Sequence, residues 1–174
     1  MADPTGRVPA GVMVRPAPDW FDELMAFGGY SFDDTIPDTE CYVNVGLYNN
    51  GSAGTLLRVY GLSCYADSDG AFVMYPLFGT GGFCPLGPGF PLRFDKQQVI
   101  GSLYWKVELV SPPAPNPIVP PTNAATVATP NSGGAAWFTP FPVAVIPAGW
   151  MLVIANAASA LFAGVGLWWQ PSDV

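Results

Sequence analysis

The sequence contains no histidine and few charged residues. Only 11% of its 174 residues are charged, against roughly a quarter in an average soluble domain. Without an imidazole, Ser-His-Asp triads, Cys-His dyads and the usual base at neutral pH are excluded. The six basic residues form no cluster and the net charge is −7, so no surface is available to neutralise nucleic-acid phosphates. We therefore expect neither an enzyme nor a nucleic-acid partner, and we assign no catalytic, cofactor-binding or metal site.

Cysteine is also scarce. The three cysteines, Cys41, Cys64 and Cys84, form an odd set without CxxC spacing, and in the absence of histidine the usual zinc, haem and redox sites are missing. Free cysteine packs like a small hydrophobic side chain. We expect three reduced, buried thiols and no cofactor, while a single disulfide between two of them stays open as an alternative.

Long helices are disfavoured, because the chain carries 20 glycines and 20 prolines, which respectively raise the entropic cost of order and remove backbone donors. The start of the chain has no apolar run of the signal-peptide kind, which indicates synthesis in a cytoplasm.

Residues 143–169 are uncharged and long enough to cross a bilayer. Pro147 and Gly149 divide this run and Asn156 lies within it, so two buried strands are expected instead of a membrane span.

The N-terminal region reads as an extended arm. Prolines interrupt residues 1–19. Residues 19–30 place apolar side chains at near-helical spacing behind Asp19, with two glycines near the end, which predicts one short helix. Residues 31–40 are acidic and read as a solvated loop; their spacing does not match a calcium-binding EF-hand. The prediction is an arm over residues 1–38, including that helix.

From residue 41 onward the apolar period changes to two, which is typical of strands. Strands are expected at 41–48, 55–65, 71–78, 99–110, 137–145, 150–156 and 162–170. The turn-rich residues 49–54 predict a hairpin between the first two strands, and Pro76 favours an edge or a bulge. Lys106 and Glu108 share one face of their strand. Residues 79–91 read as a Gly/Pro-rich loop.

Residues 111–136 are rich in proline and uncharged, so they predict a linker or an extended arm. The whole pattern indicates an all-β fold, an antiparallel β-sandwich or jelly-roll-like domain over residues 39–174, with Pro/Gly-rich arms and at most one short helix. Bulky apolar residues in the arms and loops are candidate partner contacts: Trp20, Phe21, Phe83, Leu86, Phe90, Ile118, Val119 and Trp137.

Two chemical alternatives remain. A carboxylate pair such as Glu40 with Glu108, or with an aspartate of residues 33–38, could hydrolyse glycosides, although nothing in the sequence singles these residues out. Exposed aromatic rings could stack on sugars. For Trp105, Trp150 and Trp168 we expect places in the core, and the exposure of the other tryptophans stays open. The glycines of residues 79–82 are not followed by the Gly-Lys-Ser/Thr of a phosphate-binding loop.

Two tracts carry a family resemblance. Residues 141–170, with the turn sequence IPAGW and the following strand MLVIAN, resemble the closing segment of small β-sandwich proteins of tailed-phage virions. The segment VNVGLYNNGS and its partner LLRVYGLS resemble the first hairpin of such proteins. The resemblance covers about half the chain, and its motifs are mostly general β-turn chemistry.

The resemblance implies a non-enzymatic subunit located in the virion, either cementing or decorating the capsid or building a collar, tail or fibre. In this class, self-association is common, often as a trimer. The partners would be further copies and the major capsid protein or other virion subunits, with the arms at 1–19 and 111–136 lying across neighbours. The alternatives are a receptor- or glycan-binding module of a phage tail or fibre, and a carboxylate-dependent glycosidase.

Overall fold

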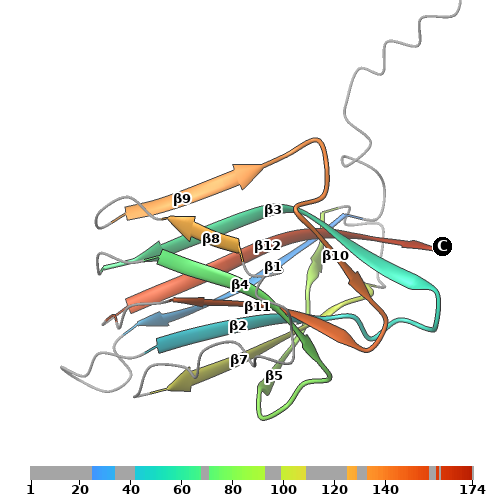
Figure 1. Cartoon of the computed structure of the whole chain (residues 1–174), viewed down its shortest axis with the longest axis horizontal. Helices are drawn as coiled ribbons and strands as arrows, with labels where there is room; N and C mark the ends of the chain where they lie inside the picture. The colour runs from blue at the N-terminus through green and yellow to red at the C-terminus, as the bar shows by residue number, and fades with distance from the viewer. Residues whose placement is uncertain are drawn as a thin grey trace, which may run out of the picture.

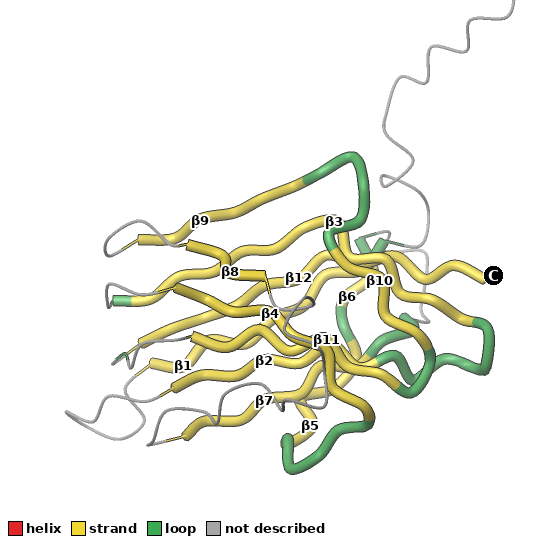
Figure 2. Tube along the Cα trace, in the orientation of Figure 1, coloured by secondary structure: helices red, strands yellow, loops and turns green. Residues whose placement is uncertain are grey.

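The computed structural model describes residues 25–33, 42–67, 71–92, 99–108, 125–128, 133–156, 160 and 162–173. These residues form two antiparallel β-sheets and contain no helix. Figure 1 shows the strands arranged in two layers, and Figure 2 shows that loops connect them. The prediction of an all-β, antiparallel sandwich is confirmed. The jelly-roll topology stays a prediction.

The first sheet, called sheet I here, has the strand order β10-β3-β12-β1-β6, and β9 also pairs with β3. Its strands are β1 (Ala26–Asp33), β3 (Thr55–Ala66), β6 (Phe90–Pro91), β9 (Gly133–Phe138), β10 (Ala144–Pro147) and β12 (Phe162–Asp173). β3 and β12 are the longest strands and pair along nearly their whole length. Sheet I is therefore built around this central pair.

The second sheet, called sheet II, has the order β5-β7-β2-β11-β4-β8. Its strands are β2 (Tyr42–Tyr48), β4 (Ala71–Phe78), β5 (Cys84–Pro88), β7 (Ser102–Glu108), β8 (Ala125–Ala128) and β11 (Trp150–Asn156). β8 pairs only with residues 71–74 of β4. Pro76 pairs with Leu152 of β11 and lies beyond the β8 ladder. At this position β4 has no described neighbour on its other side, in line with the edge position expected for proline.

The core lies between the two sheets. Alternate residues of β12, ending at Leu167 and Trp169, point inward and are buried, and Val43, Val45 and Leu47 of β2 meet them from sheet II. Alternation along each strand puts every second side chain on this inner face. Burial of these apolar side chains is the main stabilising contribution to the fold.

Trp169 is the largest fully buried side chain. Its indole Nε1 donates a hydrogen bond of 2.7 Å to the backbone oxygen of Ile100. Three glycines, Gly28, Gly89 and Gly101, leave room for the ring, because a Cβ at any of them would lie within 3.3 Å of an indole atom. The sequence analysis expected Trp168 in the core. This prediction is wrong, because Trp168 points outward and Trp169 fills the core.

The predicted hairpin between residues 41–48 and 55–65 is wrong, although both strands exist. β2 pairs with β7 and β11 in sheet II, whereas β3 pairs with β9, β10 and β12 in sheet I. The six residues 49–54 carry the chain from one sheet to the other, and they exceed the loops of about two to five residues that close hairpins. β2 is an interior strand of sheet II, with β7 on one side and β11 on the other, and its central residues are buried on both faces.

The helix predicted for residues 19–30 is wrong from Ala26 onward, because Ala26–Asp33 is strand β1. This strand pairs with β12 over its whole length, and the pairing overrides the near-helical spacing of the apolar residues. Residues 26–33 therefore belong to the sandwich, and the acidic loop predicted from residue 31 is wrong for residues 31–33; residues 34–41 lie outside the described residues. Residues 1–24 lie outside the described residues.

The two segments predicted to be loops contain short strands. The 79–91 loop holds β5 and β6, which pair with β7 and β1. The 111–136 arm holds β8, which pairs with β4, and most of β9, which pairs with β3. These strands are short and rich in small or proline residues, so the sequence pattern did not separate them from turns. The candidate contacts Ile118 and Val119 lie outside the described residues.

The uncharged run of residues 143–169 contains all of β10, all of β11 and residues 162–169 of β12. The strands expected at 150–156 and 162–170 are confirmed. The single strand expected at 137–145 is wrong, because a loop over residues 139–143 separates the end of β9 from β10. The predicted turn after Pro147 is present, with Gly149 at a φ of 79°. Among the described residues, no helix long and apolar enough to cross a membrane occurs.

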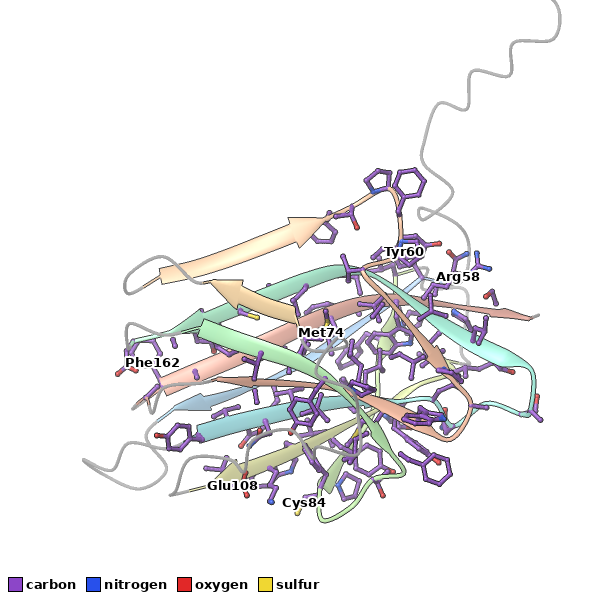
Figure 3. The ribbon with its side chains drawn as sticks, viewed as in Figure 1. Arg58, Tyr60, Met74, Cys84, Glu108 and Phe162 are labelled. Carbon is purple, nitrogen blue, oxygen red and sulfur yellow. The ribbon has the colours of Figure 1, made fainter. Side chains whose placement is uncertain are left out.

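The described cysteines are free and differ in exposure. Cys64 is buried in the core, whereas Cys84 is exposed on β5 (Figure 3). The expectation of buried thiols is therefore confirmed for Cys64 and wrong for Cys84, because β5 is an edge strand of sheet II. Cys41 lies outside the described residues.

Burial raises the pKa of the Cys64 thiol from 9.0 to about 12. The folded state favours the neutral thiol, so this group's contribution to stability is fully present below pH 9.0 and is lost as the pH rises toward about 12. We expect iodoacetamide at about pH 8 to alkylate Cys84 in the folded protein and to leave Cys64 unmodified, as peptide mass spectrometry would show. Equal labelling of the two thiols in the folded state would contradict the buried position of Cys64.

Candidate functional site

A row of aromatic side chains crosses the outer face of sheet I. The strand registers align Phe90 of β6 with Phe27 of β1, Phe27 with Trp168 of β12, Trp168 with Gly61 of β3, and Gly61 with Phe138 of β9. The row points away from the core, because Leu167 and Trp169, which flank Trp168, point inward. We call Phe90, Phe27, Trp168 and Phe138 the aromatic row.

Within the aromatic row, the Trp168 ring contacts the rings of Phe27 and Phe138. The Phe27 and Trp168 ring centroids lie 4.6 Å apart at 37° between planes, and those of Phe138 and Trp168 lie 4.6 Å apart at 64°. Gly61 makes the second contact possible, because a Cβ there would lie 2.6 Å from the Phe138 ring. Phe90 is 72% exposed and Phe138 is 47% exposed. The row is therefore an interlocked apolar ridge that water still reaches.

A row of small residues lies beside the ridge. Two residues further along the strands, Gly29, Gly166, Ser63 and Ala136 stand side by side on β1, β12, β3 and β9. We call them the small-residue row. Gly29 and Ala136 are exposed, whereas the Phe27 ring leans over Gly166.

Two further aromatic rings continue the outer face of sheet I beyond the small-residue row. The Tyr65 ring lies over Gly164, where an added Cβ would meet it at 2.3 Å, and its centroid is 6.3 Å from that of Phe162. Figure 3 places Phe162 and Arg58 at opposite ends of this sheet. The apolar surface thus extends along the strands as well as across them.

The loop between β9 and β10 extends the apolar surface at the β9 edge. Its backbone is held to β3 at both ends, since Thr139 N donates to Tyr60 O at 3.0 Å and Val143 N donates to Val59 O at 2.8 Å. The Thr139 hydroxyl also donates to the backbone oxygen of Phe141. Phe141 lies between two prolines and is 77% exposed. A large ring is therefore held out into solvent by a braced loop.

Sheet II carries the main polar cluster of the described residues. Asn44 of β2 is 1% exposed; its Nδ2 donates to Glu108 Oε2 at 3.2 Å, and its Oδ1 has no hydrogen-bond partner. Lys106 Nζ lies 2.6 Å from Glu108 Oε1, which confirms that these two residues share a face. Burial and, to a lesser extent, the Glu108 charge raise the pKa of Tyr75.

Glu108 is the one described residue of the carboxylate pair considered for glycoside hydrolysis. Both of its oxygens are engaged, one by Lys106 and one by Asn44. Its suggested partner Glu40 lies outside the described residues, and so do Asp34 and Asp38 of the acidic segment. Within the described ranges, no group of three or more potential ligands among His, Cys, Asp and Glu could hold a metal ion.

The structure brings one of the contact residues predicted from sequence into the aromatic row, namely Phe90. Leu86 on β5 is 40% exposed, and Phe83 just before it is partly buried. The backbone of Trp137 belongs to β9. Trp20 and Phe21 lie outside the described residues.

Sequence reasoning missed Phe27, Trp168, Phe138 and Phe141. These residues are spread over more than a hundred positions of the chain, and only the strand registers bring the first three together. One available signal was the pair Trp168-Trp169, because neighbouring residues on a strand point to opposite faces and at most one of them can fill the core. Another was the Pro-Phe-Pro sequence around Phe141.

Comparisons with protein-family models, curated proteins and solved structures gave no match. The chemistry of the site has to be judged from its own geometry.

That geometry favours an apolar protein surface over a sugar as the ligand. The rings of Phe27, Trp168 and Phe138 are tilted and packed against one another, whereas stacking on a sugar needs an open ring face. Of the small-residue row beside them, only Ser63 has a polar side chain, so few groups could bind sugar hydroxyls. Interfaces between proteins, in contrast, are enriched in aromatic side chains and depleted of charge at their centre.

Proposed function

We propose that this chain is a non-enzymatic structural subunit of a tailed-phage particle, of the capsid cement or decoration class. The observation that supports this proposal is the aromatic row across five strands of sheet I, together with the exposed ring of Phe141. Monomeric soluble proteins rarely expose contiguous apolar patches larger than a few hundred Å², and larger ones mark binding surfaces. The resemblance of residues 141–170 to virion β-sandwich proteins supplies the biological context.

In this proposal, the Phe141 loop anchors the subunit on a neighbouring virion protein, such as the major capsid protein. A ring presented on a braced loop loses little conformational entropy on binding, and buried aromatic residues commonly dominate interface energies. The proline residues on either side of Phe141 restrict the unbound loop further. The loop is therefore the part of the surface best suited to enter a pocket on a partner.

The test is reconstitution on particles that lack the chain. Wild-type protein should co-sediment with them, and Phe141→Ser should weaken binding about tenfold or more, as expected for an aromatic anchor. Phe78→Ser is the matched control, because Phe78 is also strongly exposed (72%) but lies on β4 of sheet II. Equal binding by Phe141→Ser and wild type would refute the anchoring role, and no binding by wild-type protein would refute the cement function.

Binding to particles should also resist salt. The aromatic row and the Phe141 loop carry no charged side chains, and salt screens only charge interactions. We expect the bound fraction to change little between low salt and about 1 M NaCl, measured by sedimentation. Release of the protein at high salt would contradict an apolar contact.

A further inference from the structure

The outer face of sheet I has a shape that can pair with itself. The aromatic row and the small-residue row run parallel across the strands and are two residues apart, about 7 Å. Gly29, Ser63 and Ala136 carry smaller side chains than Phe27 and Phe138 beside them. The face therefore consists of a ridge next to a lower strip, except where the Phe27 ring covers Gly166.

We propose that two copies of this chain associate face to face through sheet I. The two-fold axis of the pair runs parallel to the aromatic row and lies between the aromatic row and the small-residue row. Such an axis lays each strand over the same strand of the other copy, in the opposite direction. Phe138 then lies over the partner's Ala136, and Phe27 lies over the partner's Gly29. On β9 and β1 each ring of the ridge meets a small residue of the other copy, whereas on β12 Trp168 lies over Gly166 and the Phe27 ring that covers it. The contacts are reciprocal, as an isologous interface requires.

The distribution of charge suits a second copy of a chain whose net charge is −7. The two rows at the centre contain no charged residue, so no like charges meet there. Arg58 is exposed and lies on the other side of the aromatic row, where it pairs in register with Gln170. The two-fold axis places it opposite the partner's Tyr65, and a guanidinium is attracted to an aromatic face.

The size of the face fits a small interface, of the kind found in weak, concentration-dependent pairs. Five strands about 4.8 Å apart and four residue rows about 7 Å apart cover roughly 500 Å² on each copy. The pair would bury roughly 1,000 Å², which reaches the lower bound for specific protein interfaces. Aligned packing of two twisted sheets is also a standard arrangement in sandwich proteins.

The test is the mass of the purified full chain by size exclusion with light scattering across a concentration series. We expect twice the chain mass of 18.4 kDa. Ala136→Phe fills the lower strip at an exposed position of β9 and should weaken the pair about tenfold or more. Ala53→Phe is the matched control, because Ala53 is exposed in the loop before β3; this variant should dimerise like wild type. Circular dichroism and thermal unfolding would verify that both variants fold.

Phe138→Ser, which removes a ring from the ridge, should weaken the pair to a similar extent. A monomer at all concentrations, a trimer, or a dimer unaffected by Ala136→Phe would each overturn the inference. The inferred pairing rests on the proposed function only because both use the apolar surface of sheet I. The pairing and the cement function can therefore fail separately. A monomer that still binds particles through Phe141 would refute the pairing alone, whereas a dimer that binds no particle would refute the cement function alone.

Discussion

Replacing Trp169 with alanine is expected to lower the free energy of unfolding by about 3 to 5 kcal/mol, the usual range for removing a large aromatic side chain from a core. The ring is fully buried, and three glycines shape the space around it. Rigid strands on both sides limit how far the cavity left by the Trp169 ring can collapse. Most of the loss in the free energy of unfolding should therefore persist. Urea unfolding followed by circular dichroism measures the effect.

Two further variants separate packing from hydrogen bonding at Trp169. Trp169→Phe keeps most of the ring but leaves the backbone oxygen of Ile100 without its indole donor, which should cost about 1 to 3 kcal/mol from the hydrogen bond. Phe141→Ala, at an exposed position, should change stability by less than about 0.5 kcal/mol. If Trp169→Ala cost no more than Phe141→Ala, the central position of Trp169 in the core would be wrong.

Replacing Asn49 with alanine is expected to cost about 3 kcal/mol or more, because three hydrogen bonds are lost in a buried place. Its Nδ2 donates to the backbone oxygens of Thr55 and Ile146 at 2.8 Å each, and its Oδ1 accepts from Gly51 N at 2.9 Å. The Asn49 backbone also pairs with the β10–β11 turn. One side chain thus holds the segment that carries the chain from sheet II to sheet I.

The matched control for Asn49 is its neighbour Asn50, which is exposed and bonds to Gly101 N and to the Ser102 hydroxyl. Asn50→Ala should cost about 1 kcal/mol, since water can replace part of these bonds. Chemical unfolding of both variants gives the comparison. Equal losses of stability would contradict the role assigned to Asn49 at the crossing between the sheets.

The sequence was informative where short apolar segments lie between turn residues. β4, β7, β11 and β12 were placed within a few residues of their bounds, because β7 alternates clearly and β4 and β11 are short apolar runs bounded by turn residues, both of which are local signals. The turn at Gly149 was also predicted, since glycine readily adopts its positive φ. These features depend on a few neighbouring residues, which is why sequence reasoning reaches them.

Features that depend on pairing partners far along the chain were not accessible. The hairpin between β2 and β3 was the simplest arrangement for neighbouring strands, but the two strands belong to different sheets. β1 carried a helix-like spacing that its pairing with β12 overrides. The aromatic row is the clearest case: its members come from four strands, and their alignment follows from the registers alone.

The aromatic row gives the proposed function its physical basis, since a face of this kind is stabilised when another protein covers it. The row does not contribute to the core between the sheets, and its rings remain partly exposed. A subunit built in this way would gain stability on assembly, because binding to the folded state shifts the unfolding equilibrium. The small number of charged residues is consistent with such a covered surface.

The proposed function requires the gene for this chain to lie in a phage genome, and the measurement that tests the central claim most directly is quantitative mass spectrometry of purified virions of such a phage. The claim requires the chain to be present in a fixed copy number comparable to that of other structural subunits, and to remain after a wash in about 1 M NaCl. Detection of the chain in infected cells but not in purified particles would contradict a role as a virion subunit.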